Sequence, residues 1–342
     1  MTTYDQNLIK NYRQHPGVNY SLLSQLSSGV EYVGRKKFSD ALTFGSLVDT
    51  KLFTPELESE QFVIMGDYQM SEQMKLYADT LIAFHKEAEI TQYADLNEWK
   101  EAAREKAGFK ISVAQLDKKF EGDCKNYVNF ILSNQEKTPI SPDVEAKAQA
   151  LAVLVKNHPY SMEWFGDPEE GTQILYQYPV YFPIPSSIIG NDKIELEGKA
   201  LLDIVKINHK EKTVLPIDFK TIGSPVKYFM GNYFKYKYYY QDEWYWFALD
   251  NAFGTNTEDS YNVHDMSFLV ASSESSYPVL YHINKTDAER DIIWEGGIIN
   301  GYRIRGIVQL IRDYVWHLEN GFEIDREIAE NGGKLTIPFT LE

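Results

Sequence analysis

Two segments typical of β-strands follow one another in the middle of this chain, residues 194–207 and 213–221. Both are rich in apolar and β-branched residues, and only the polar run from Asn208 to Lys212 separates them. A connector this short joins neighbouring antiparallel strands, whereas parallel strands need a crossover of a dozen or more residues. The sequence therefore predicts a hairpin inside a sheet, and this hairpin limits the folds that the chain can adopt.

About the first 160 residues show the periodicity of helices instead. Turn and helix-start signals at Pro16-Gly17, Thr54-Pro55 and Ser141-Pro142 divide this part of the chain. Apolar residues recur at helical spacing in five segments: 20–26, 42–53, 70–84, 113–132 and 144–155.

The pattern changes after Trp164. The remaining predicted elements are a strand at 173–182, an aromatic helix at 233–249, and strands at 266–271 and 279–283. Thr286 and Glu289 form a capping-box signature for a last helix that runs toward His317, although several glycines weaken it.

This order of elements predicts an α+β, or mixed α/β, fold. We expect one domain of residues 1–342. It would comprise a mainly helical N-terminal part (1–165), a sheet-containing core (166–320) and a C-terminal tail (321–342).

Composition narrows the class of protein. With 43% hydrophobic and 25% charged residues, the chain has the makeup of a globular protein. Cys124 is the only cysteine, which excludes an internal disulfide, a thiolate zinc site and a four-cysteine iron–sulfur cluster. The apolar runs are too short for a membrane span, and the first residues do not resemble a secretion signal. We therefore expect a cytoplasmic protein without a membrane partner.

Three polar residues stand out within the apolar hairpin. Strand alternation places Asp218 and Lys220 on one face, and pairing of the two strands can bring Asp203 close to Asp218. Two neighbouring carboxylates repel each other unless a cation lies between them. Hard oxygen ligands suit Mg²⁺ or Mn²⁺, which also bind phosphate. A strand-end salt bridge is the better explanation of Asp218 and Lys220 taken alone, but the additional Asp203 favours a metal site.

Five short motifs resemble those of one enzyme family. Residues 197–203 (EGKALLD) and 216–221 (PIDFKT) are similar to the second and third motifs of the RecB-like PD-(D/E)xK nucleases. Residues 241–245 (QDEWY) resemble their Gln-x-x-x-Tyr motif, and residues 42–49 resemble their Gly-x-x-x-His helix. Residues 20–26 are similar to the Ser-x-Leu opening of the phage RecE-type exonucleases.

The resemblance implies a restriction-endonuclease-like core sheet flanked by helices. It also implies metal ligation by Asp203 and Asp218, with the main-chain carbonyl of Phe219 as a third ligand and Lys220 as the catalytic lysine. Gln241 and Tyr245 would then lie near the site and the DNA, although plain core packing explains Tyr245 equally well.

The chain departs from the family pattern at two places. Asp49 stands where the family usually has His, and it can serve as an oxygen ligand for the metal or as a solvated helix residue. Leu201 and Leu202 stand where a basic residue often precedes the second-motif aspartate, with Lys199 nearby.

The resemblance implies a Mg²⁺- or Mn²⁺-dependent DNA exonuclease of phage or bacterial recombination or DNA-end processing. Its partners would be double-stranded DNA ends, further copies of the chain, and a single-strand annealing or recombination protein. An endonuclease on the same core and a catalytically inactive DNA- or protein-binding relative are the alternatives. The net charge of −16 requires any DNA-binding surface to be a local basic groove.

Overall fold

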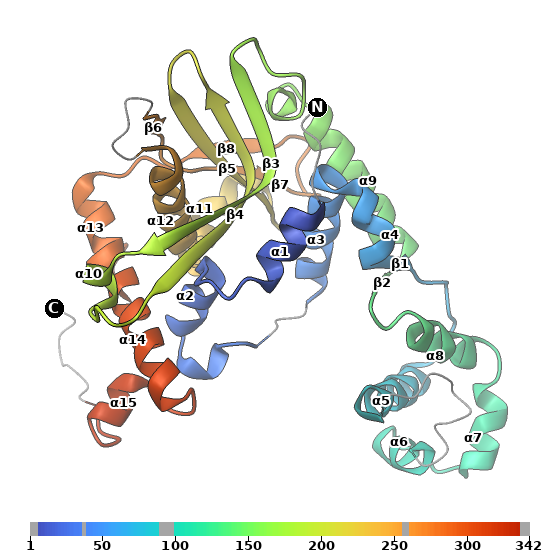
Figure 1. Cartoon of the computed structure of the whole chain (residues 1–342). Helices are drawn as coiled ribbons and strands as arrows, with labels where there is room; N and C mark the ends of the chain where they lie inside the picture. The colour runs from blue at the N-terminus through green and yellow to red at the C-terminus, as the bar shows by residue number, and fades with distance from the viewer. Residues whose placement is uncertain (1–5, 36–38, 89–98, 255–259, 336–342) are drawn as a thin grey trace. The chain divides into compact units, whose positions relative to one another are not determined.

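A computed structural model describes residues 6–35, 39–88, 99–254 and 260–335 of the chain (Figure 1). It combines helices with sheets, which confirms the mixed class. The chain divides into two compact units, Met1–Gly45 with Leu151–Glu342, and Ser46–Ala150. The first unit thus takes residues from both sides of the expected boundary at residue 165. The expectation of a single domain stays a prediction.

The first unit contains a six-stranded mixed sheet in the order β3-β4-β5-β7-β8, with the short β6 pairing β5. β5 pairs with β6 and β7 in parallel, and the other neighbours are antiparallel. The strands are β3 Thr172–Ile184, β4 Leu196–Asn208, β5 Thr213–Thr221, β6 Asn262–Val263, β7 Ser267–Ala271 and β8 Val279–His282. The predicted hairpin is confirmed, since β4 and β5 pair across a turn at residues 209–212.

Helices of the first unit pack against this sheet, and α12 contacts β3, β4 and β5 (Figure 1). The helices are α1 Gln6–Gln14, α2 Tyr20–Leu26, α10 Ser186–Ile189, α11 Phe229–Lys235, α12 Tyr238–Leu249, α13 Asp287–Glu295, α14 Ile307–Asn320 and α15 Arg326–Glu330. Trp244 of α12 is fully buried against Phe182, and a Cβ at Gly198 would lie 2.4 Å from the Phe182 ring. Glycine at position 198 therefore lets the helix approach the sheet.

The second unit is mainly helical. It contains α4 Glu58–Gln61, α5 Glu72–Ala88, α6 Lys100–Lys106, α7 Val113–Phe120, α8 Asp123–Ser133 and the parallel pair β1 Phe62–Ile64 and β2 Thr138–Ile140. Tyr77, Leu81 and Phe120 are buried in its core. Two further helices, α3 Asp40–Phe53 and α9 Pro142–Asn157, run across the division between the units.

Three predicted helices are wrong in extent because special backbone conformations interrupt them. Lys237, at φ 58°, separates α11 from α12 within the predicted 233–249 helix. Gly122, at φ 86°, separates α7 from α8. The helix predicted to run toward His317 consists of α13, then a hairpin of β9 Gly296–Ile299 and β10 Tyr302–Arg305, then α14. The Thr286–Glu289 capping box at the start of α13 is confirmed.

None of the helices in the described ranges is long and apolar enough to cross a lipid bilayer.

Candidate active site

The candidate site lies where the hydrogen-bonded pairing of β4 and β5 ends. The last register pair of β4 and β5 is Ile204 with Ile217, so the next position along the same register sets Asp203 opposite Asp218. The Asp203 side chain is near enough to act on the pKa of Asp218, which it lowers. The sequence prediction that Asp203 and Asp218 come together is thereby confirmed, while their role as metal ligands stays a prediction.

Asp218 is buried and has two close partners. Its Oδ1 accepts a hydrogen bond of 2.6 Å from Nε2 of Gln241. Its Oδ2 lies 2.6 Å from Nζ of Lys220 and accepts no well-directed hydrogen bond from any described residue. A buried carboxylate oxygen whose one close neighbour is a cation is suited to coordinate a second cation.

Asp203 is half-buried and held from two sides. Its Oδ2 accepts a hydrogen bond of 2.9 Å from the main-chain N–H of Phe219. Its Oδ1 accepts one of 2.9 Å from Nε2 of Gln177 on β3. These contacts fix the orientation of the carboxylate beside Asp218.

Gln177 is a site residue that the sequence analysis missed. Its φ of 47° is rare for a residue other than glycine. The β3–β4 register continues on both sides, with Tyr176 opposite Ile204 and Tyr178 opposite Leu202, so Gln177 stands opposite Asp203. Strained backbone of this kind persists where surrounding structure holds it in place, often at functional sites. A glutamine inside an ordinary strand pattern gives no sequence signal of this conformation.

Lys220 occupies the same face as Asp218, as strand alternation predicts. Its side chain is 20% exposed, and its Nζ lies 5.0 Å from the centre of the Tyr238 ring. Tyr20 at the start of α2 is also near enough to interact electrostatically with the lysine. The ammonium group therefore lies between a carboxylate and two aromatic side chains at the edge of the site.

The charges of Asp218 and Lys220 shift each other's pKa. Burial raises the pKa of Asp218 above its ordinary value, although the Lys220 ammonium acts to lower it. Burial acts to lower the pKa of Lys220, but Asp218 together with Tyr238, Tyr20 and Asp203 outweighs this effect, and the lysine pKa is raised. Lys220 is consequently a permanent cation at neutral pH rather than a proton acceptor.

Gln241 and Tyr245 lie on one face of α12, directed toward the site. Gln241 is buried and binds Asp218, as described above. Tyr245 is buried too, and its ring packs edge-on against Tyr20 at 6.5 Å. Burial first, and then the nearby Asp218 and Asp203, raise its pKa. Placement of both residues beside the carboxylates agrees with the sequence prediction, and their contact with DNA stays a prediction.

Lys199 lies apart from this cluster. Its buried Nζ donates to the main-chain oxygens of Tyr12 and His15, at 2.9 and 2.5 Å. The lysine therefore anchors the segment after α1 to β4.

Asp49 belongs to the second unit. Four residues before it on α3, Gly45 belongs to the first unit, where a Cβ would lie 2.9 Å from Oγ1 of Thr221. A glycine is thus needed where α3 approaches the end of β5. Within the described ranges, no group of three or more Asp, Glu, His or Cys side chains is placed to hold a metal ion. The predicted role of Asp49 as a third carboxylate ligand stays a prediction.

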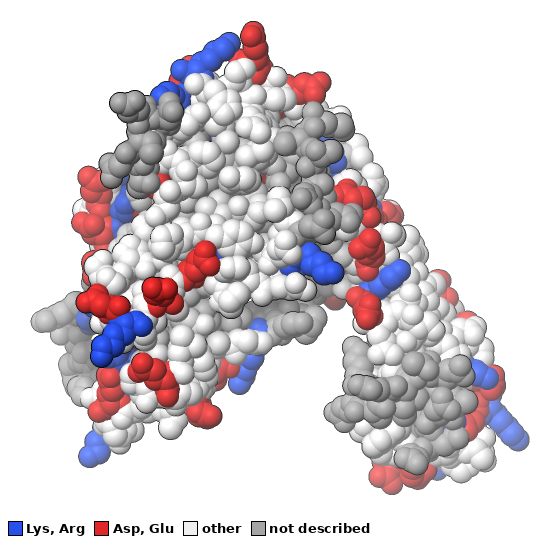
Figure 2. All heavy atoms as spheres, viewed as in Figure 1, with Lys and Arg blue, Asp and Glu red and all other residues white. Residues whose placement is uncertain are grey.

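The face of the first unit drawn in Figure 2 shows small mixed groups of acidic and basic side chains around a largely uncharged centre. The basic groove expected for DNA binding is not visible on this face.

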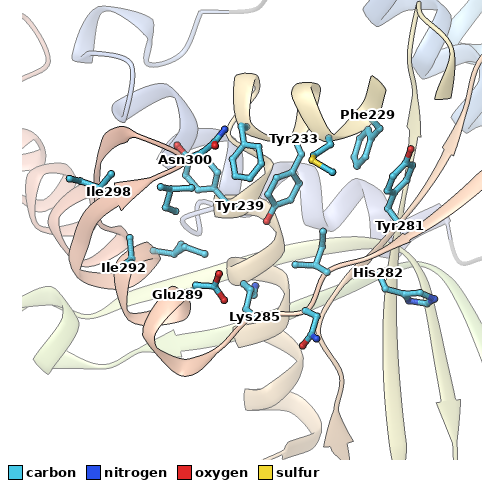
Figure 3. A pocket seen from close by; sticks show the side chains of 16 residues that line it. Phe229, Tyr233, Tyr239, Tyr281, His282, Lys285, Glu289, Ile292, Ile298 and Asn300 are labelled. Carbon is cyan, nitrogen blue, oxygen red and sulfur yellow. The ribbon is translucent and has the colours of Figure 1, made fainter. Parts of the chain in front are cut away.

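A cavity of about 490 Å³, shown in Figure 3, is lined by apolar and aromatic residues such as Phe229, Tyr281 and Ile298. Its lining includes none of the predicted site residues of the first unit.

Comparison with known proteins adds little to this geometry. No protein-family profile matches the sequence, and no curated protein matches it. Among solved structures, the chain is similar to a crystal structure at 2.19 Å resolution of a "Putative exonuclease" from Eubacterium rectale, with 11% identity. The match covers 100% of this chain and 97% of that chain, at a TM-score of 0.41. A likeness this low carries no argument about function.

Proposed function

We propose that the chain is a divalent-metal-dependent deoxyribonuclease of the PD-(D/E)xK type that degrades DNA from double-stranded ends. One observation carries the proposal. Asp203, Asp218 and Lys220 meet where β4 and β5 stop pairing, with Gln241 bonded to Asp218 from the following helix. Three of the five motifs that resemble this family, residues 197–203, 216–221 and 241–245, thus contribute side chains to one cluster.

The donor set fits Mg²⁺ or Mn²⁺. It consists of two carboxylates, one of them buried with an oxygen that lacks a well-directed hydrogen bond from the described residues. The family resemblance adds the main-chain carbonyl of Phe219, and water completes the coordination of such ions. A bound divalent cation would lower the pKa of a water molecule and neutralise charge on the scissile phosphate.

The side chains of this chain then have distinct roles. Asp203 and Asp218 would hold the cation, while Gln177 and Gln241 keep the two carboxylates oriented. Lys220 stays protonated, so it stabilises negative charge that develops on the phosphate and orients the attacking water. A cation at this site would compete with the Lys220 ammonium, whose Nζ lies 2.6 Å from Oδ2 of Asp218.

One observation favours a second candidate, a catalytically inactive DNA-binding relative. Nζ of Lys220 lies 2.6 Å from Oδ2 of Asp218, the distance expected of a purely structural salt bridge. In this alternative, the pair stabilises the end of the sheet and the chain binds DNA without cleaving it.

Incubation of the chain with linear and with covalently closed circular duplex DNA, with and without Mg²⁺, tests the proposal. We expect degradation of the linear form only, abolished by EDTA and by Asp218→Asn, and retained by the exposed control Asp192→Asn. Cleavage of both forms indicates an endonuclease, and cleavage of neither under any divalent metal indicates the inactive relative. The phage or bacterial origin, the cytoplasmic location, the homo-oligomer and the recombination partner protein stay predictions.

A further inference from the structure

A second concave surface of the first unit lies between the start of α12 and the β9–β10 hairpin. It encloses about 650 Å³. Its walls carry basic and aromatic residues, namely Lys235, Lys237, Tyr239 and Tyr240 on one side and Tyr302, Arg303 and Arg305 on the other. We refer to these seven residues as the basic groove.

Charge is distributed unusually at this place for a chain with a net charge of −16. No acidic residue occurs between Asp218 and Asp242, a stretch that contains four lysines and six tyrosines. No acidic residue occurs in residues 296–306 either, which form the opposite wall. Both walls of the groove are therefore positive, although Arg305 is paired with Asp313. The ammonium of Lys237 is held by Ser27 and Ser28, so Lys235 and Arg303 are the basic side chains best placed to bind anions.

Aromatic faces are available beside these charges. Tyr302 is 72% exposed on the hairpin, so its ring is accessible to a ligand. On the α11 side, Tyr236 is 48% exposed and lies under the ammonium of Lys235, which is 5.3 Å from the ring centre. Exposed rings next to cations are the features that bind unpaired nucleotides, because bases stack on the rings while phosphates meet the cations.

The backbone fixes both walls. Asn300 and Gly301, both at positive φ, form the tight turn that presents Tyr302 at the start of β10. Across the groove, Lys237 has a φ of 58°, and its Nζ donates to the main-chain oxygen of Ser27 at 3.0 Å. The groove is therefore preorganised and does not depend on a flexible loop.

The groove is also connected to the candidate active site through one helix. Tyr238, beside Lys220, is followed directly by Tyr239 and Tyr240, which line the groove. The groove further shares Phe234, Tyr239, Ile299 and Asn300 with the apolar cavity of Figure 3. The start of α12 thus contributes both to the site, through Tyr238, and to the groove, through Tyr239 and Tyr240.

We propose that the basic groove binds single-stranded DNA. The inference deepens the proposed nuclease function, on which it rests, by assigning a place to an unpaired strand next to the site. A DNA duplex cannot make the same contacts, because its bases are stacked inside the double helix and cannot lie against Tyr302. The groove offers stacking surfaces as well as charge, which favours the unpaired strand.

Fluorescence anisotropy of a labelled 16-nucleotide oligothymidylate in EDTA tests the proposal on the full chain. We expect Tyr302→Ala to weaken binding by on the order of tenfold, the effect of losing one stacked base. Arg303→Ala should reduce the slope of log K against log salt concentration by about 0.7, the share of one phosphate contact on a single strand. The matched controls Tyr160→Ala and Lys210→Ala replace an exposed ring and an exposed lysine outside the groove.

Because the measurement contains no divalent metal, it does not depend on cleavage. Binding that is lost only in the groove variants supports the groove even if the chain cleaves no DNA. Unchanged binding in Tyr302→Ala, or equal losses in the controls, overturns the groove even if the chain is an active nuclease. An equal loss of affinity for a blunt duplex overturns the single-strand assignment, and tighter binding of the matching RNA overturns the assignment to DNA.

Discussion

Gln177 and Gln241 each donate to one carboxylate of the site, from β3 and from α12. Neither side chain can replace a metal ligand by itself, but each limits where its carboxylate points. Groups behind metal ligands typically account for about 10–100-fold of metal affinity. At the residue scale, the site therefore depends on these two amides as well as on the charged groups.

Gln177→Ala should lower Mg²⁺ affinity by on the order of tenfold, because Asp203 loses one of the bonds that orient it. Isothermal titration calorimetry measures the change, with Gln173→Ala on the same strand as the matched control. A purely structural role for Gln177 would change the thermal stability and leave the metal affinity of the folded protein as it was. That result would remove Gln177 from the site.

At the element scale, α12 links the site to a buried ionic network. Asp242 and Glu243 directly follow Gln241 and are fully buried. Lys285 lies 2.8 Å from Asp242 and 2.7 Å from Glu243, and Tyr233 donates to Asp242 at 2.9 Å. Breaking a buried pair costs more than the pair contributes, since it leaves a charge uncompensated. The network therefore fixes the position of the helix that supplies Gln241.

Burial raises the pKa of Asp242 from 3.8 to about 6, although Lys285 opposes the change. The folded state thus retains a proton that the unfolded chain releases, and this contribution to stability is lost as pH rises from about 4 to 6. Asp242→Asn lacks this dependence. Its free energy of unfolding relative to the parent should rise by on the order of 3 kcal/mol over that interval.

Urea unfolding at pH 4, 5, 6 and 7 measures this difference, with the exposed Asp192→Asn as the control. In the variant, Lys285 keeps its ion pair with Glu243. A difference between parent and Asp242→Asn that stays constant with pH would show that folding does not raise the pKa of Asp242.

Elements of ordinary geometry were predictable from the sequence. β5 has the predicted bounds, and the β4–β5 hairpin follows from its short polar connector, which also brings Asp203 to Asp218. The break at Lys237 was not predictable, because lysine favours helices and the left-handed conformation there is imposed by tertiary contacts. The β9–β10 hairpin was missed although its Asn300-Gly301 turn is a known hairpin signal, since the strands around it are only four residues long.

At the scale of the whole molecule, the predicted site residues do not all belong to the same unit. Asp49 is the one predicted ligand in the second unit, and its substitution for the usual His of the resembled motif leaves its role to experiment. The sequence could not decide between a ligand and a solvated helix residue, because helix periodicity is the same for both.

Asp49→Asn should lower Mg²⁺ or Mn²⁺ affinity by at least about tenfold if Asp49 is a ligand, since even groups behind the ligands account for that much. Calorimetry of the parent and the variant measures affinity and stoichiometry. Asp40→Asn, at the start of the same helix, is the control. Unchanged values for Asp49→Asn would leave a two-carboxylate site in the first unit.

The central claim is that Lys220 and Asp218 form a catalytic pair, and single-turnover cleavage of a linear duplex at saturating Mg²⁺ tests it most directly. We predict that Lys220→Ala loses roughly 10²–10³-fold in rate, the effect of removing one preorganised charge-stabilising donor. Its DNA affinity, titrated in Ca²⁺ to suppress cleavage, should stay near that of the parent. Lys210→Ala should behave as the parent in both measurements. Cleavage by Lys220→Ala at the parental rate, or a parent that cleaves no DNA with any divalent metal, would contradict the account.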